Sequence, residues 1–268
     1  MLTDKNLCQE KHPVLYILFM IVIKTPKEID LMQRVNQIVA QSLKKVIDVI
    51  EPGITTLELD AIAESHIRAK GAVPAFLGYH GYPKSLCVSI NEEVVHGIPS
   101  KRKIESGDVV SLDLGAIKDG FVGDSAFTVA VGHVPERTRK LIRASGDALY
   151  KGIDQARAGN RLYDISAAIQ NHVESFGFSV VRQYVGHGIG RNMHEDPQIP
   201  NFGKAGTGIP LRDGMTFAIE PMVNMGGWEV VLQKDGWTVV TSDKSISVHF
   251  EHSIAITKNG PIILSELS

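Results

Sequence analysis

Two aspartates stand on neighbouring segments that both alternate between apolar and polar residues. Asp113 lies in segment 109–116 and Asp124 in segment 121–130, and between them stands Asp119-Gly120, a dipeptide typical of two-residue hairpin turns. In that hairpin, residues whose numbers sum to 239 face each other, so the two aspartates are diagonal neighbours on one face. Carboxylates this close repel unless a proton or a cation lies between them. On this segment alone, a solvated strand position for Asp124 remains the alternative.

Three further segments place one imidazole and two carboxylates in apolar surroundings. His187 lies in GHGIG, where the glycines permit a close backbone approach to a site. Glu220 ends the apolar run FAIEP, and Glu251 lies within FEHSI. An acid in an apolar strand needs a partner, although each glutamate taken alone is equally consistent with a strand at a sheet edge.

Together these five residues predict a catalytic metal centre. Two aspartates, two glutamates and one histidine form an oxygen-rich donor set, and four carboxylates balance the charge of two divalent cations. Such a set suits Mn, Fe(II), Co, Ni or Zn in a catalytic role, whereas structural zinc prefers cysteine. We therefore expect two ions about 3.5–4 Å apart that activate a shared water for hydrolysis.

Helical segments flank the candidate strands. A capping box with proline at 25–28 begins a long helix, and apolar residues at steps of three and four give it one buried face over 29–50. A second helix is predicted from residue 55 to about residue 71. Alternation of period two predicts strands at 86–90, 109–116, 121–130, 215–220 and 249–256.

The helical pattern occurs twice in the chain. Seven residues between Leu43 and Gly71 are identical to those 106 positions later, between Leu149 and Gly177. Both copies have the order helix, glycine turn, helix, glycine and strands. We therefore predict an α+β fold in which duplicated helix–helix–strand halves surround a central antiparallel sheet about a pseudo-two-fold axis. No linker-like stretch separates the halves, which favours a single domain.

Composition narrows the class of protein. The 268 residues are 43% hydrophobic and 22% charged with a net charge of −2, which gives no basic excess for binding nucleic acid. Cys8 and Cys87 cannot form a disulfide scaffold, which favours the cytoplasm. The apolar run 14–23 is shorter than the roughly 20 residues that a membrane span needs. A signal peptide is the alternative, but no small-residue cleavage site follows the run.

The sequence resembles the type I methionine aminopeptidases of the pita-bread metallopeptidase superfamily. The resemblance starts at about Met20, and its motifs follow the family's order: PAFLGYHGYPKSLCVSINEEVVHGIP, DLGAIKDGFVGD, YVGHGIGRNMHEDP, FAIEPMV, DGWTVVTSDKSIS and FEHSIAIT. It implies the pita-bread fold and dinuclear metal-dependent removal of the N-terminal methionine from nascent proteins, with small second residues preferred. It also implies a cytoplasmic monomer that contacts the ribosome transiently and binds neither membrane nor a specific nucleic acid.

The same resemblance implies a role for each site residue. The metal ligands are Asp113, Asp124, His187, Glu220 and Glu251. Among them, Asp124 and Glu251 bridge both ions, and Glu220 also moves the proton. His194 stabilises the negative charge that develops on the substrate carbonyl. His96 contacts the scissile amide or the substrate amine, although a histidine in a loop would otherwise have no assigned role.

The resemblance also implies a methionine pocket, lined by Tyr79, Tyr82, Cys87, Met193 and Trp237. Soft, apolar and aromatic groups suit a thioether. Phe76 stands where relatives of this type often have cysteine, and Met193 where many have phenylalanine, so the width of the pocket is open. Asn91 and Ser247 match positions that hold a monovalent cation in relatives.

Residues 1–19 have no counterpart in the family. We expect residues 20–268 to form the catalytic domain and translation to start at Met20, or the preceding segment to be dispensable. Two other functions stay open. Xaa-Pro aminopeptidases and prolidases share the superfamily but usually carry a further N-terminal domain. A non-catalytic binding paralogue would be expected to have lost metal ligands, yet all five residues are present.

Overall fold

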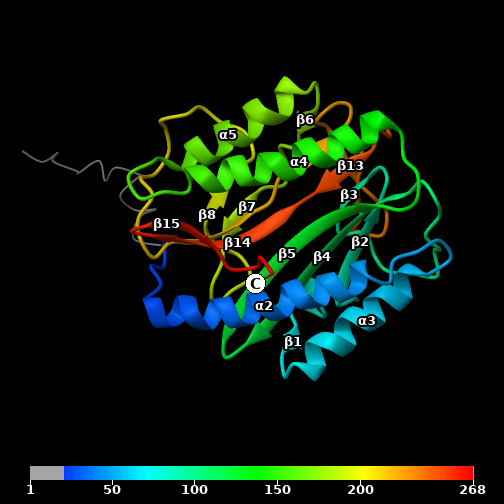
Figure 1. Cartoon of the computed structure of the whole chain (residues 1–268), viewed down its shortest axis with the longest axis horizontal. Coiled ribbons are helices and arrows are strands. Elements are labelled where there is room, and N and C mark those ends of the chain that lie inside the picture. Colours follow the sequence, from blue (N-terminus) through cyan, green and yellow to red (C-terminus); the bar gives the residue numbers. More distant parts are fainter. Residues whose placement is uncertain (1–20, 268) are drawn as a thin grey trace, which may run out of the picture.

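A computed structural model describes residues 21–267 (Figure 1). The expected boundary at residue 19 and the apolar run up to residue 20 lie outside these residues. Within the described part, the helices are all too short or too polar to cross a membrane. Cys87 is buried with a free thiol.

A nine-stranded antiparallel sheet forms the centre of the molecule. Its strand order is β1 (Val73–Pro74), β4 (Val109–Lys118), β5 (Phe121–Ala130), β14 (Glu251–Thr257), β9 (Thr216–Ile219), β7 (Gly186–Gly188) and β8 (Glu195–Ile199). Off this path, β2 (Leu86–Ile90) pairs with β4, and β15 (Gly260–Ile263) pairs with β14. The curled sheet therefore places strands that are distant in the sequence side by side.

Two small sheets and a short 3-10 turn complete the strand-rich side. One sheet has the order β13 (Ser247–His249), β10 (Met222–Asn224), β6 (Ser179–Val180), and the other β11 (Val230–Leu232), β12 (Val239–Thr241), β3 (Glu93–Val95). The turn η1 covers Tyr79–Gly81. The predicted strand 249–256 is broken at Phe250, because the chain passes there from the small sheet of β13 into the central sheet.

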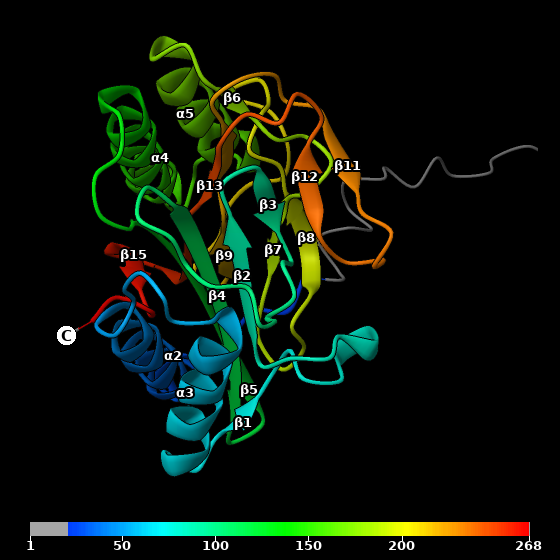
Figure 2. The ribbon, with the colours of Figure 1, turned by 90° about the vertical axis from the view of Figure 1, so that its right-hand side faces the viewer.

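Four helices cover one face of the central sheet (Figure 2). They are α2 (Pro26–Ile47), α3 (Thr56–Ala69), α4 (Glu136–Gln155) and α5 (Leu162–Ser175). The predicted capping box at Thr25 and Glu28 is present, and a second one caps α3. Helix α2 ends at Ile47, earlier than its apolar periodicity predicted. The N–H groups of Val49 and Ile50 bond carbonyls only three residues back, so the helix tightens into a turn.

The glycine turns of the two halves adopt the same backbone conformation. Gly53 and Gly159 have φ angles of 101° and 100°, in a region that side-chain-bearing residues rarely adopt. The N–H of Gly53 donates to Ile104 O at 2.8 Å, and that of Gly159 donates to Leu211 O at 3.1 Å. The duplication predicted from the sequence is therefore confirmed, with each glycine closing its helix pair onto an equivalent segment.

Each helix pair has its own core against the shared sheet. Leu59, Ile67 and Leu112 belong to the cluster under α2 and α3. Leu141 and Ile254 belong to the cluster under α4 and α5. All of these side chains are fully buried. Hydrophobic burial on the helical face thus fixes the sheet, and the opposite face is free to carry polar side chains.

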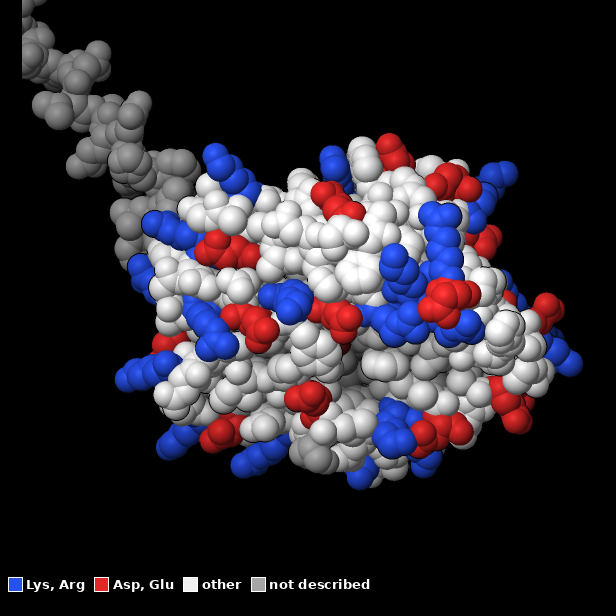
Figure 3. Space-filling model, turned by 45° about the horizontal axis from the view of Figure 1, so that its top comes forward, with Lys and Arg blue, Asp and Glu red and all other residues white. Residues whose placement is uncertain are grey.

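Charged side chains of both signs are interspersed over the face that includes α4 and α5 (Figure 3). Among the described residues on this face, acidic groups lie next to the basic ones, as in the contacts of Glu136 with Arg139 and Arg143 at 2.8 Å. This face therefore carries positive and negative side chains together, as the small net charge of −2 predicts.

Candidate metal centre and substrate pocket

The β4–β5 hairpin has the register predicted from its turn. Lys118 pairs with Phe121, Gly115 with Asp124, and Asp113 with Ala126. On the other side of β5, Ala126 pairs with Glu251 of β14. Asp113 and Glu251 therefore stand in one row across three strands, with Asp124 diagonal to both.

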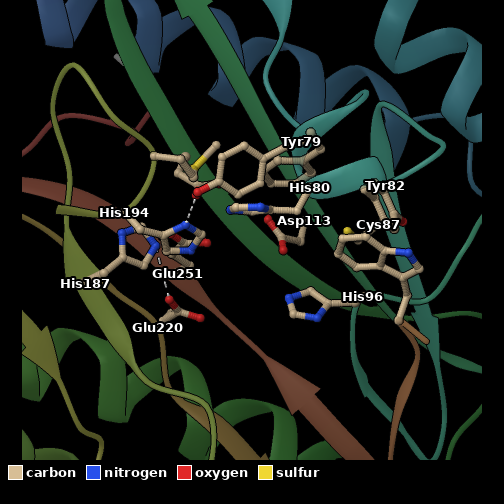
Figure 4. A pocket seen from close by; sticks show the side chains of 14 residues that line it. Tyr79, His80, Tyr82, Cys87, His96, Asp113, His187, His194, Glu220 and Glu251 are labelled. Atoms are coloured by element: carbon tan, nitrogen blue, oxygen red, sulfur yellow. Dashed lines mark hydrogen bonds and ion pairs between the residues drawn. The ribbon is translucent and has the colours of Figure 1, made fainter. Parts of the chain in front are cut away.

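The structure brings all five candidate ligands into one pocket (Figure 4). Donor atoms of Asp124, His187 and Glu251 all lie within 4.8 Å of one another. His187 reaches the cluster because β7 pairs with β9, and its Nε2 lies 3.5 Å from Oε1 of Glu220. The fifth residue, Asp113, lines the same pocket from β4.

The buried donor atoms of this cluster lack hydrogen-bond partners. Oδ1 of Asp113, Oδ1 of Asp124 and Oε1 of Glu251 are all buried and unpaired among the described residues. His187 donates its Nδ1–H to the carbonyl of Gly188 at 2.9 Å, which leaves the lone pair of Nε2 facing Glu220. Buried polar atoms are normally satisfied, so this set fits divalent cations held by oxygen and one imidazole.

The pKa values of the five candidate ligands also fit a site for divalent cations. Burial raises the pKa of Glu220 to about 8 and, despite the nearby His249, that of Asp113 to about 7. Burial, reinforced by neighbouring carboxylates, also raises the pKa values of Asp124 and Glu251 well above their ordinary range. Burial lowers the pKa of His187 to about 4. Without cations, the cluster retains protons on its acids and a neutral imidazole, and cations can replace those protons.

His194 lies on an exposed loop beside the cluster. Its Nδ1 is 2.7 Å from the hydroxyl of Tyr79, and its ring centroid is 4.3 Å from that of His187. Burial, followed by the charge of Asp124, raises the pKa of Tyr79, so its hydroxyl stays protonated and can donate. Tyr79, predicted only as a pocket wall, therefore also contacts a predicted catalytic residue.

His96 follows β3 in a left-handed backbone conformation, with φ of 62°. Non-glycine residues in this region are uncommon and often mark functional sites. Its ring packs edge-on against Tyr184 at 5.8 Å and Trp237 at 6.4 Å between centroids. Burial lowers its pKa to about 4, so the ring is neutral at physiological pH.

The candidate ligands share one cavity of about 200 Å³ with a set of apolar and aromatic side chains. The expected pocket residues all line it: Tyr79, Tyr82, Cys87, Met193 and Trp237. Tyr82 is held by donating its hydroxyl to the carbonyls of Leu86 and Gly97, and its ring packs edge-on against Trp237 at 5.1 Å. Burial raises the pKa of the Cys87 thiol, which stays protonated in the wall.

The two departures from the family pattern lie together in this pocket. A Cβ atom on Gly115 would come within 2.7 Å of Phe76 and 3.0 Å of Met193, so both side chains rest on this glycine of β4. Both also line the pocket. The phenylalanine at position 76 is thus accompanied by methionine at position 193, a slimmer and more flexible side chain than phenylalanine.

Asn91 and Ser247, predicted to hold a monovalent cation, are neighbours in the structure. The N–H of Ser247 donates to the backbone carbonyl of Asn91 at 2.8 Å. The Asn91 side chain contacts Asp108 and Val109, and the Ser247 hydroxyl donates to Asn224. The cation site itself stays a prediction.

Two histidines near the site were missed from the sequence. His80 lines the pocket in a left-handed conformation with φ of 48°, and it packs against Tyr79. His249 is buried, and its Nε2 lies 3.5 Å from Oε2 of Glu220. Its spacing of two residues from Glu251 was a usable signal, because alternate residues of an extended chain share a face.

Comparison with known proteins agrees with this geometry. The model of metallopeptidase family M24 matches residues 30–258. The chain belongs to this family. It is 50% identical over 247 residues to the methionine aminopeptidase of Clostridium acetobutylicum, covering 92% of this chain and 99% of that protein.

Solved M24 structures show how much of each relative the chain covers. The methionine aminopeptidase of Thermotoga maritima superposes with a TM-score of 0.91 at 51% identity, covering 92% of this chain and all of the other. The prolidase of Pyrococcus horikoshii has a TM-score of 0.75 at 25% identity, and only 65% of its chain is covered. The chain therefore has the pita-bread fold of this family, and M24 membership implies divalent metal.

Proposed function

We propose that the chain removes the N-terminal methionine from proteins by metal-dependent hydrolysis. One observation carries the proposal: unpaired carboxylates and an imidazole line the same cavity as a set of apolar and aromatic side chains. Support comes from the M24 relatives, since the chain spans essentially the full length of methionine aminopeptidases but only 65% of the prolidase.

Two divalent ions would be held by Asp113, Asp124, His187, Glu220 and Glu251. Donor atoms of Asp124 and Glu251 lie within 4.8 Å of those of His187, so these two carboxylates would be central to the set that holds the ions. Such ions would supply Lewis-acid polarisation of the substrate carbonyl and a water molecule of lowered pKa.

The protein side chains supply proton transfer and charge stabilisation. The Tyr79 hydroxyl lies 2.7 Å from Nδ1 of His194, and in the arrangement we assign it donates, so that Nε2 carries the ring proton and would donate it to the carbonyl oxygen as negative charge develops. Glu220, which lines the same cavity and lies 3.5 Å from Nε2 of His187, would accept a proton from the attacking water and pass it to the leaving amine. His96 is neutral and can bond the scissile amide or the substrate amine.

The pocket sets the specificity for the first residue. Aromatic rings of Tyr82 and Trp237 and the Cys87 thiol offer the soft contacts that a methionine thioether favours. A small second residue would fit beside His80 and His194, which line the cavity and are exposed. Action on nascent chains would place the protein in the cytoplasm, as a monomer in transient contact with the ribosome. Asn91 and Ser247 would add a monovalent cation site.

Peptide cleavage separates this function from the prolidase alternative. Chain reconstituted with Mn²⁺ or Co²⁺ should release methionine from Met-Ala-Ser and leave Ala-Pro-Ser intact. The control is the same protein after dialysis against a chelator, which should be inactive and recover on adding metal. Preferential cleavage of Ala-Pro-Ser would show an Xaa-Pro peptidase, and binding without cleavage of either peptide would show a non-catalytic paralogue.

A further inference from the structure

A buried ion pair lies beside the site but takes no part in the chemistry above. Lys24 Nζ contacts Oε2 of Glu195, and their side chains are only 3% and 7% exposed. Lys24 precedes α2 and is itself anchored, because its N–H donates to Gly214 O at 2.8 Å and its Nζ donates to Val22 O at 3.1 Å. Glu195 directly follows His194 and begins β8.

The Glu195 carboxylate organises the loop that carries His194. Its Oε1 accepts the backbone N–H of Arg191 at 2.8 Å and that of Asn192 at 3.2 Å, while Oε2 accepts from Lys24. The Glu195 side chain thus links its own end of the loop to residues 191 and 192 and connects the loop to the segment before α2.

Gly190 shows how closely Lys24 and Glu195 fit the loop. A Cβ atom there would lie 2.5 Å from Cε of Lys24 and 2.7 Å from Oε1 of Glu195. No larger residue fits unless the ion pair moves, so the loop backbone rests directly on it. The backbone of the loop therefore packs directly against the ion pair, and the carbonyl of Gly190 also accepts the N–H of Val122 at 2.8 Å.

The His194 ring packs against His187, but its backbone position depends on the loop that carries it. The residue is exposed and lies in a bend outside the strands, and its ring has one hydrogen bond, to Tyr79. A shift of about 1 Å in such a group costs catalysis severely. Removing one partner of a buried ion pair leaves the other charge unpaired and favours such a shift.

We propose that Lys24 and Glu195 are positioning residues that hold His194 over the pocket. The segment before α2 would then be part of the catalytic apparatus, although none of its residues lines the pocket among those described. The proposal rests on the proposed role of His194 in stabilising the transition state.

The test is a set of single and combined substitutions. Glu195→Gln keeps the size and one acceptor oxygen but removes the charge, and Lys24→Met removes the charge from the other side. Each should lower kcat roughly tenfold, less than the roughly 10²-fold expected for loss of the donor itself, with KM and bound metal unchanged. In ¹⁵N-labelled protein, the His194 ring resonances should broaden or shift.

Two controls separate positioning from stability. Arg191→Met removes the exposed contact of the same loop with Glu28, 3.2 Å long, and should leave kcat within about twofold. In a His194→Ala background, Glu195→Gln should have no further effect on kcat, because it acts through the missing ring. Melting temperatures of all variants report stability separately.

Three results would overturn the proposal. They are an unchanged kcat with only a lower melting temperature, an equal loss of kcat in the His194→Ala background, or failure of both single variants to fold. Failure of the proposed function looks different, since wild-type chain would not release methionine. An active wild type whose kcat is unaffected by His194→Ala would refute the role of His194 and the positioning proposal with it.

Discussion

Removing divalent metal should make the thermal stability of the chain fall as the pH rises from 6.5 to 8. Burial raises the pKa values of Asp113 and Glu220 to about 7 and about 8, from ordinary values of 3.8 and 4.5. A carboxyl whose pKa is higher in the folded state binds more protons there than in the unfolded state. The free energy of unfolding therefore falls as the pH rises between the two values.

Histidine rings offset part of this loss at the lower end of the window from pH 6.5 to 8. Burial lowers the pKa values of His96 and His187 to about 4, so these rings oppose the acids below pH 6.5, where only the unfolded chain would protonate them. The rings become largely neutral in both states only above about pH 7.5, one unit past the ordinary histidine pKa of 6.5. Between pH 6.5 and 8, Glu220 alone contributes a loss of about 1.5 kcal/mol, less than the full slope of about 1.4 kcal/mol per unit because it is half deprotonated at pH 8.

Asp124 and Glu251 add to this loss, because burial and mutual repulsion raise their pKa values further. For a chain of this size a loss of about 2 kcal/mol corresponds to roughly 4–8 °C in melting temperature. Calorimetry at constant ionic strength would compare chain freed of metal and chelator with chain reloaded with Mn²⁺. The reloaded chain should change little, so stabilisation by metal should grow with pH.

Glu251→Gln provides the matched control, because it removes one of the raised carboxyls while keeping its shape. The metal-free variant should melt higher than metal-free wild type at pH 8 and show a weaker dependence on pH. A metal-free wild-type melting temperature that is constant or rises between pH 6.5 and 8 would refute the electrostatic reasoning.

Three further outcomes are expected. Asp124→Asn should bind metal at least about tenfold more weakly and lose activity at low metal concentration. Metal titration measures the affinity, and circular dichroism should show that the fold is kept. Normal turnover at low metal would contradict the role of Asp124 as a ligand. His194→Ala should lower kcat by roughly 10²-fold or more with full metal content, and loss of metal would instead identify His194 as a ligand. Met-Gly peptides should be cleaved much faster than Met-Arg peptides, since a large second residue collides with the rim, and equal rates in a competition assay would exclude that selectivity.

The sequence alone determined the features that depend on neighbours along the chain. The turn Asp119-Gly120 sets the β4–β5 register by local backbone geometry, and so it placed Asp113 and Asp124 on one face. The capping boxes at Thr25 and Thr55 begin their helices through contacts three residues apart. The glycine turns of the duplicated halves follow from the conformations that only glycine adopts readily.

Contacts between distant segments were decided by the tertiary structure. The pairing of β14 with β5, which places Glu251 in the row of Asp113, depends on how two hydrophobic cores pack against one sheet. The family resemblance named the ligands, but it gave neither the hydrogen bond of Tyr79 to His194 nor the approach of His249 to Glu220.

The ion pair of Lys24 and Glu195 is the clearest example of a contact that the sequence alone could not predict. The two residues are 171 positions apart, and neither stands in an apolar periodic pattern that marks it as buried. Their charges are compatible with solvent exposure in the sequence, since charged residues are buried only when a partner is supplied. That partner exists only once the segment before α2 and the loop 190–195 are brought together by the folded sheet.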